Sequence, residues 1–385
     1  MVKRKSLLRL GTVICVLSVL ISALAVPSSA ATFRDESDAR SLILIEANTG
    51  TVLFERDADL ALPPASVTKI MTMLLVMEAI DSGVIKYDDM VTVSETAASM
   101  GGSQVYLEPG EQMSVHEMLK CVVVSSANDA CVALAEHIAG SEASFVDRMN
   151  AKAAELGMTH TVFENTNGLD DTTVNHLTSA RDIAKMSAEL IVKHPKILEY
   201  SSIWMDSIRN GEFGLTNTNR LIRFYSGANG LKTGSTSKAK FCISASAKRG
   251  DMQLICVVMG ASTRDNRNEV AKKMLDFGFA NYAYEEFPAS ELENMPVIGG
   301  KEESIPLSFG DFGTVVDKAN AGKVEQKINL PQSVSAPIKA GDVIGNIQYV
   351  LNGEVISEVP ITAAESTERV TFWDVFKALL REITR

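Results

Sequence analysis

The sequence has few of the residues that most often bind transition metals. It contains five histidines and five cysteines among 385 residues. No cysteines show Cys-x-x-Cys spacing, and no two histidines lie close enough in sequence to suggest a zinc site. We therefore expect no metal, no nucleotide and no other cofactor. The histidines are expected to be structural or exposed, and only His176, just before Thr178–Asp182, is a candidate for shaping the rear of a cleft.

Basic residues are also scarce relative to acidic ones, with 37 Lys and Arg against 48 Asp and Glu. Residues 1–30 hold four of the basic residues and no acidic residue, so the chain without them has 33 basic and 48 acidic residues, a net charge of −15. This charge makes the chain a poor candidate for binding nucleic acid.

The N-terminus has the pattern of a secretory signal peptide. A basic region ending at Arg9 precedes an apolar run over residues 10–26, and Ser28–Ala30 supplies small residues for cleavage. We predict a signal peptide over residues 1–30 and export to the outer face of the cytoplasmic membrane or the cell wall. An uncleaved membrane anchor is the alternative, since the apolar run approaches spanning length.

An apolar fraction of 46% excludes a disordered chain and provides for a large core in two or three domains. The cysteines after residue 30 each lie in an apolar run, so buried free thiols are the expected state. Cys242 and Cys256 flank a predicted hairpin turn at 248–251, and a disulfide between them is the alternative.

The chain is organised around one short stretch, Pro63–Lys69. An amphipathic run over 70–80 follows the prolines and ends before Gly83, which predicts a helix. Ser66 and Lys69 then project from one face of its first turn. A hydroxyl beside an amine suits an activated nucleophile if the amine can lose its proton, although Ser-x-x-Lys alone is also common as a helix cap followed by a solvated lysine.

Strand patterns occur early and late in the chain, with helical patterns between them. Strands are predicted at 41–45, 51–54, 241–247 and 252–259, and helices at 114–139, 145–156, 179–193 and 269–277. Polar residues 125–129 interrupt the first of these helices and predict a turn exposed in a cleft. The order predicts an α/β (α+β) fold with helices packed on a mixed sheet, which strand 41–45 joins.

After a linker near residue 287 the character of the sequence changes. Short apolar strands alternate with Gly, Pro and Asn turns and predict a small β-domain over 287–366, with strands at 304–307, 313–316, 326–330, 343–350 and 354–360.

The tail, 367–385, returns to helical spacing with an aromatic face and the basic residues Lys377, Arg381 and Arg385. It is too short to cross a bilayer and fits a helix lying in the membrane interface. A helix docked on the chain's own surface is the alternative.

Three short motifs together could supply an acyl-transfer site. They are Ser66 with Lys69, Ser126 with Asn128, and the strand start Lys232-Thr233-Gly234 followed by Ser235. Such a site needs a nucleophile, a base, a proton relay, an anion binder and an oxyanion hole. Each motif is weak alone, but the set is specific in this order and spacing.

With these motifs the chain resembles the D-alanyl-D-alanine carboxypeptidases, the low-molecular-mass penicillin-binding proteins of bacterial walls. The resemblance covers roughly 38–385 and includes the segments Tyr106–Gly110, Thr178–Asp182 and Gly230–Gly234. It implies a penicillin-binding-protein/β-lactamase-like transpeptidase domain over 31–286, with a mixed or antiparallel sheet and a helical subdomain, a β-sandwich-like domain over 287–366 and a membrane-association helix over 367–385. Two departures are Ala127, where many members have glycine, and Ser235, where some have histidine.

The resemblance also implies the activity. The chain would remove the terminal D-alanine from peptidoglycan pentapeptides and would be acylated by β-lactam antibiotics. Ser66 would be the nucleophile, Lys69 the proton acceptor, and Ser126 the relay to the leaving amine. The substrate would be bound by Asn128, Lys232, Thr233 and Gly234, with the backbone of Ser235 in the oxyanion hole. Lys69 must be desolvated or lie near a cation such as Lys232 to act at neutral pH.

Three other interpretations share these motifs. A β-lactamase would need fast deacylation, but Glu164, which lies where a class A enzyme has its deacylating glutamate, is expected to be a surface loop residue. A D,D-endopeptidase or transpeptidase would act on crosslinks. A noncatalytic wall-binding protein would have a decayed site, whereas every expected motif residue is present.

Overall fold

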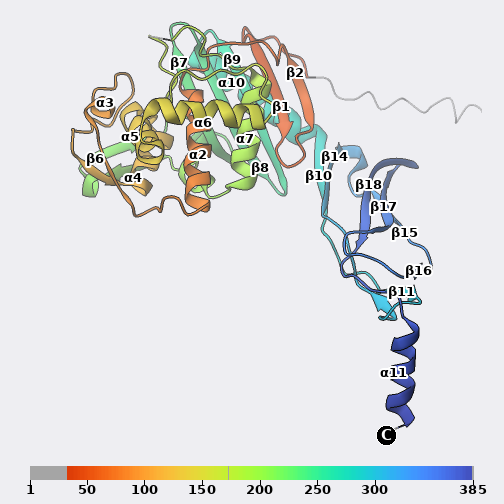
Figure 1. Ribbon diagram of the computed structural model, residues 1–385. Coiled ribbons are helices and arrows are strands. Elements are labelled where there is room, and N and C mark those ends of the chain that lie inside the picture. Colours follow the sequence, from red (N-terminus) through yellow and green to blue (C-terminus); the bar gives the residue numbers. More distant parts are fainter. Residues whose placement is uncertain (1–32, 172, 384–385) are drawn as a thin grey trace, which may run out of the picture. The chain divides into compact units, whose positions relative to one another are not determined.

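The computed structural model describes residues 33–171 and 173–383; the predicted signal peptide lies outside them. A five-stranded sheet with the strand order β2-β1-β9-β8-β7 forms the centre of the first part of the chain (Figure 1). Its strands are β1 (Ser41–Glu46), β2 (Val52–Arg56), β7 (Ala228–Thr236), β8 (Lys240–Arg249) and β9 (Met252–Ala261). Every pair is antiparallel, so of the mixed or antiparallel sheet that was expected the structure has the antiparallel one. Strand β1 pairs with β9, so strand 41–45 joins the late strands, as predicted.

Helices cover both faces of this sheet. Ser187 of α7 (Ala180–Lys193) shares a hydrogen bond with Ser244 on one face. On the other face, Cys256 lies against Met274 of α10 (Arg264–Asn281). Side chains of a strand alternate between faces, so a strand covered on both sides must be apolar throughout. This explains why nearly the whole of β9 is a continuous apolar run with every residue buried.

Helix α2 (Lys69–Asp81) lies inside the helical region and is buried almost all round, so its residues are apolar on nearly every face. A short 3₁₀ turn, Ala65–Thr68, precedes it. The other helices of this part of the chain are α3 (Glu95–Ala98), α4 (Val115–Lys120), α5 (Asn128–Ala139), α6 (Glu142–Glu155), α8 (Ile197–Ser201) and α9 (Leu221–Phe224). The two-stranded pairs β3 (Met90–Thr92) with β4 (Gln112–Ser114) and β5 (Met205–Ile208) with β6 (Phe213–Thr216) connect them.

Serine and threonine caps fix where several of these helices begin. The hydroxyl oxygens of Ser114, Ser179 and Thr263 accept the backbone N–H three residues on, at 3.1–3.2 Å. Each cap satisfies one of the N–H groups that a helix start leaves unpaired.

The described chain after α10 is all β except for one 3₁₀ turn and the last helix. Its strands are β10 (Tyr282–Phe287), β11 (Met295–Ile298), β12 (Ser304–Ile305), β13 (Leu307–Ser308), β14 (Phe312–Asp317), β15 (Glu325–Asn329), β16 (Val334–Ser335), β17 (Val343–Leu351) and β18 (Glu354–Ala363). The predicted strands are present. The sequence analysis missed β10, which pairs with β14 although nearly all of it precedes the predicted boundary at residue 287.

The last helix, α11 (Phe372–Ile383), has no buried residue over its described length. Its apolar side chains are exposed, among them Phe372, Trp373, Leu379 and Ile383. No helix in the described part of the chain is long and apolar enough to cross a membrane.

The alternative of a disulfide between Cys242 and Cys256 is wrong. Cys256 pairs in register with Ala245, and Cys242 lies at an irregularity beside Phe241, so the two thiols do not face each other. All four described cysteines are free and buried, as expected. Burial raises the pKa of the Cys242 thiol to about 11.

Candidate active site

Ser66 lies in the turn that leads into α2. The turn begins at Ala65, whose φ of 50° is left-handed, and it turns the half-buried Ser66 side chain toward a hollow in the surface. A left-handed alanine is strained, so the surrounding structure must hold it.

Lys69, one turn on, is completely buried. Its Nζ lies 2.9 Å from Ser66 Oγ, 2.7 Å from Asn128 Oδ1 and 2.8 Å from the carbonyl oxygen of Asn167. A protonated amine donates to all three oxygens. A neutral amine has only two hydrogens, so it can donate to the amide and the carbonyl while its lone pair accepts the Ser66 hydroxyl proton.

Burial lowers the pKa of Lys69 to about 8, because the charged form loses its hydration, while the nearby Cys131 and Asp129 act in the opposite direction. The sequence suggested two ways to lower the pKa of Lys69, desolvation and a nearby cation, and desolvation is the one that acts here. Burial also brings the pKa of Lys232 well below its usual range, and there the charge of Lys69 adds to the effect.

Ser126 and Asn128 lie at a break between two helices, as predicted. A π-helical turn, Cys121–Ser125, ends in Ser126 with a left-handed φ of 64°, and α5 begins at Asn128. Ser126 lines the same hollow as Ser66. The Asn128 amide accepts from Lys69 and donates to the carbonyl oxygen of Gly101 at 2.7 Å, so in this structure it holds the lysine in place.

Strand β7 forms the edge of the sheet beside Ser66. A Cβ on Gly234 would lie 2.8 Å from the backbone nitrogen of Ser66, so the strand can approach this turn only with glycine there. Thr233 and Ser235 line the hollow, and the Thr233 hydroxyl donates to Thr218 Oγ1 at 2.8 Å. Lys232 is not among the lining residues; its Nζ donates to the carbonyl oxygen of Thr233 at 3.0 Å.

The hollow has a volume of about 390 Å³. Of the predicted residues, Ser66, Ser126, Thr233, Gly234 and Ser235 line it, while Lys69, Asn128 and Lys232 lie buried beside it. The structure adds Arg267 to this set. No sequence pattern points to this residue, since an arginine on a helix usually extends into solvent.

Arg267 is only 3% exposed. Its guanidinium donates to the carbonyl oxygen of Cys242 and to Asn268 Oδ1. Burial and the charge of Arg264 lower its pKa to about 10, so the group is still a cation at neutral pH. A buried cation with few hydrogen-bond acceptors around it is suited to bind an anion.

A loop over 163–176 supports the Ser66 turn from behind. The Nδ1 of His176 accepts the Glu164 N–H at 3.0 Å, which leaves its Nε2 to donate to Thr68 Oγ1 at 2.8 Å. The Thr68 hydroxyl donates in turn to the carbonyl oxygen of Ala65. Burial lowers the pKa of His176 to about 4, so this ring is neutral at pH 7. His176 thus lies behind the cleft, as the sequence suggested.

Glu164 is exposed, as expected for a surface loop residue. Its carboxylate accepts the backbone N–H groups of Val174 and Asn175 at 2.8 and 3.0 Å and does not line the hollow. This position does not support a deacylating role.

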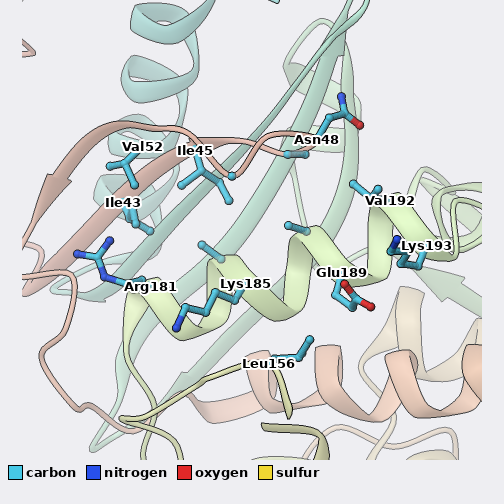
Figure 2. A pocket seen from close by; sticks show the side chains of 14 residues that line it. Ile43, Ile45, Asn48, Val52, Leu156, Arg181, Lys185, Glu189, Val192 and Lys193 are labelled. Atoms are coloured by element: carbon cyan, nitrogen blue, oxygen red, sulfur yellow. The ribbon is translucent and has the colours of Figure 1, made fainter. Parts of the chain in front are cut away.

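Another hollow, of about 440 Å³, lies between α7 and the β1–β2 hairpin (Figure 2). Its floor is apolar, including Ile43 and Ile45, and two of its three cations are already in ion pairs: Arg181 pairs with Glu55, and Lys185 with Asp182. The described residues that line it include no serine, threonine or cysteine that could act as a nucleophile. We therefore assign the chemistry to the hollow at Ser66.

Comparisons with known proteins agree with this geometry. The family model for D-alanyl-D-alanine carboxypeptidase (peptidase S11) matches residues 28–263, and that for the penicillin-binding protein 5 C-terminal domain matches residues 288–369. D-alanyl-D-alanine carboxypeptidase DacF of Bacillus subtilis is 43% identical over 381 residues, 97% of each chain. DacC of Escherichia coli is 36% identical over 88% of this chain and 87% of that protein.

Solved structures give the same result. Penicillin-binding protein 5 from Haemophilus influenzae matches with a TM-score of 0.77 at 32% identity, over 88% of this chain and all of that one. Penicillin-binding protein D2 from Listeria monocytogenes in its ampicillin-bound form matches 64% of this chain and all of that one, with a TM-score of 0.59 at 30% identity.

Proposed function

Because the chain belongs to the D-alanyl-D-alanine carboxypeptidase family, it is a serine peptidase, and we propose that it removes the terminal D-alanine from peptidoglycan stem peptides through an acyl-enzyme at Ser66. The observation that carries this proposal is the 2.9 Å contact between Ser66 Oγ and the buried, easily deprotonated Lys69 amine.

In the acylation step, neutral Lys69 takes the proton of the Ser66 hydroxyl as Oγ attacks the carbonyl carbon between the two D-alanines. The C–N bond then breaks, and Ser126 passes a proton to the leaving amine of the released D-alanine. Water attacks the ester in the second step, giving the shortened peptide and restoring the Ser66 hydroxyl. The Ser126 role is supported by its place in the lining of the same hollow.

The negative charge that develops on the carbonyl oxygen needs donors near Ser66. We assign them to the backbone N–H groups of Ser66 and Ser235. The close approach of β7 at Gly234 and the position of β7 at the sheet edge support this assignment, since no described strand covers the outer side of β7.

The free carboxylate of the substrate would be bound by Thr233 and Arg267, with the buried Lys232 amine behind them as a hydrogen-bond donor. Arg267 and Thr233 line the hollow together with Ser66, which supports recognition of a chain end close to the bond that is cleaved. A preference for peptides with a free C-terminus follows.

We test the activity with a pentapeptide ending in D-Ala-D-Ala. The protein should release one D-alanine per peptide, Ser66→Ala should release none, and the exposed-site control Ser308→Ala should behave like wild type. A β-lactamase would instead turn over penicillin rapidly without a long-lived adduct, and stopped-flow hydrolysis separates the two. A noncatalytic wall-binding protein would release no D-alanine.

β-Lactams are expected to acylate the same serine, as the name and ampicillin-bound form of a structural relative suggest.

We further propose that the protein is exported and is attached to the membrane surface through α11. Exposed aromatic side chains on a helix that also carries Lys377 and Arg381 support this proposal.

A further inference from the structure

The hollow at Ser66 is rich in cations although the chain as a whole is acidic. Its described lining contains Arg220, Arg264 and Arg267 and no aspartate or glutamate. The whole chain has 48 acidic and 37 basic residues. Arg267 is used by the carboxylate of D-alanine in the proposed reaction, so two arginines at the hollow have no role yet.

Arg220 and Arg264 both lie next to the groups proposed to bind the terminal carboxylate. Arg264 precedes Arg267 by three residues on α10, so the two side chains project from the same side of the helix. Arg220 follows Thr218, whose hydroxyl accepts from Thr233. Both arginines therefore flank the leaving-group end of the cleft.

Neither arginine has an ion pair with a carboxylate among the residues that the structure describes, and both are exposed. By contrast, Arg181 and Arg209 elsewhere pair with glutamates at 2.6 and 2.8 Å. Asp265 and Glu269 lie with Arg220 around an adjoining hollow. Glu269 pairs with Lys272 at 2.8 Å, and neither carboxylate forms an ion pair with Arg220 or Arg264 among the described residues.

The Arg220 side chain lies over an aromatic ring that limits its freedom. Its guanidinium carbon is 5.6 Å from the ring centre of Phe224, and Phe224 in turn packs edge-on against Trp204, which lines the hollow. An arginine restrained in this way loses less entropy when it binds an anion.

We propose that Arg220 and Arg264 form a leaving-group subsite that binds a second carboxylate. The enzyme would then also cleave D-alanyl bonds whose leaving group is a dicarboxylic amino acid such as D-glutamate. The bond broken is the same C–N bond, and the leaving amine takes its proton in the same way. This inference rests on the proposed function and specifies its substrate class.

Three peptides with the same acyl part test the subsite: one ending in D-Ala-D-Ala, one in D-Ala-D-Glu and one in D-Ala-D-Gln. The last two are alike in size and differ by one carboxylate. We expect kcat/KM of the wild type to be about fivefold or more higher for the D-Glu peptide than for the D-Gln peptide, as one charge-assisted contact allows. Added salt should reduce this ratio.

In the double variant Arg220→Gln/Arg264→Gln the ratio should fall to about one, and each single variant should lower it in part. The matched control is Arg223→Gln, because Arg223 lies over Trp204 and Phe224 but does not line the hollow; it should keep the wild-type ratio. Penicillin labelling of every variant verifies that the site is folded.

A ratio near one in the wild type overturns the subsite, and so does a wild-type ratio that persists in the double variant. If none of the three peptides is hydrolysed and penicillin does not label Ser66, the proposed function itself has failed. The two failures are therefore distinguishable.

Discussion

In the proposed mechanism Lys69 decides whether Ser66 can react, because the amine must be neutral to accept the hydroxyl proton. Since burial lowers the pKa of Lys69 to about 8, only a minor fraction is neutral at pH 7 and most is neutral at pH 9. We predict that the second-order rate of acylation by a fluorescent penicillin rises with pH, with a midpoint near 8, and levels off above it. A rate that is flat or falls from pH 6 to 9 would mean that another group is the base.

Arg267 gives a second test at the scale of one residue. Its guanidinium is a buried cation in the lining of the hollow, so Arg267→Gln removes the charge that is proposed to bind the substrate carboxylate. We predict that kcat/KM for a D-Ala-D-Ala peptide falls about 10- to 100-fold.

For this loss of kcat/KM, the matched control is a modified substrate rather than a second protein variant. A peptide with its C-terminal carboxylate amidated should be hydrolysed slowly and about equally by the wild type and the variant. Arg267→Lys, which keeps the charge but not the forked geometry, should be intermediate. An equal loss on both peptides would indicate that Arg267 only supports the fold.

The contact between Ser66 and Lys69, the proposed nucleophile and base, could be predicted from the sequence because the two residues lie one helical turn apart. Arg267 could not, since its burial depends on how α10 packs against the sheet, far from its sequence neighbours. The same holds for Asn167, whose carbonyl oxygen accepts from Lys69 across 98 residues.

At the scale of elements, the loop 163–176 fixes the Ser66 turn by close backbone contact. A Cβ on Gly168 would lie 1.9 Å from the carbonyl oxygen of Ala65, and the φ of Gly168 is +82°. We predict that Gly168→Ala lowers the free energy of unfolding by at least about 2 kcal/mol and slows penicillin acylation, because the turn must move.

Gly110 provides the matched control, since its φ of +81° is nearly the same but no atom lies within 4 Å of the position that a Cβ would take. Gly110→Ala should lower the free energy of unfolding only by the backbone strain, about 1 kcal/mol, and should leave the acylation rate unchanged. Denaturant unfolding and labelling kinetics measure both effects. Similar losses in the two variants would refute the supporting role of the loop.

Most elements could be predicted from periodicity and turn residues, including the break at Ser126 and the two strands of the late hairpin. The order of strands and helices predicts that strand 41–45 joins the late strands in one sheet, and this is confirmed; its partner, β9, was not predicted. The sequence could not predict whether Cys242 and Cys256 face each other, because an irregularity beside Phe241 shifts the pairing of β8 with β9. Strand β10 was missed because its partner, β14, lies 25 residues or more further along the chain.

At the scale of the whole molecule, α11 has seven large apolar side chains that are exposed to solvent. We predict that deleting residues 369–385 moves the protein from the membrane fraction to the soluble fraction, because the helix supplies the apolar area that binds the interface. The truncated protein should still be labelled by penicillin, since the hollow contains no residue of this segment's described part. Unchanged sedimentation with membranes would refute the anchor.

The central claim is that Ser66, activated by Lys69, forms the acyl-enzyme. The most direct measurement is peptide mapping by mass spectrometry after incubation of the full chain with benzylpenicillin. One adduct with the mass of intact penicillin should be found on the peptide that contains Ser66, and none should form in Ser66→Ala. An adduct on another residue, or labelling that survives in Ser66→Ala, would contradict the account.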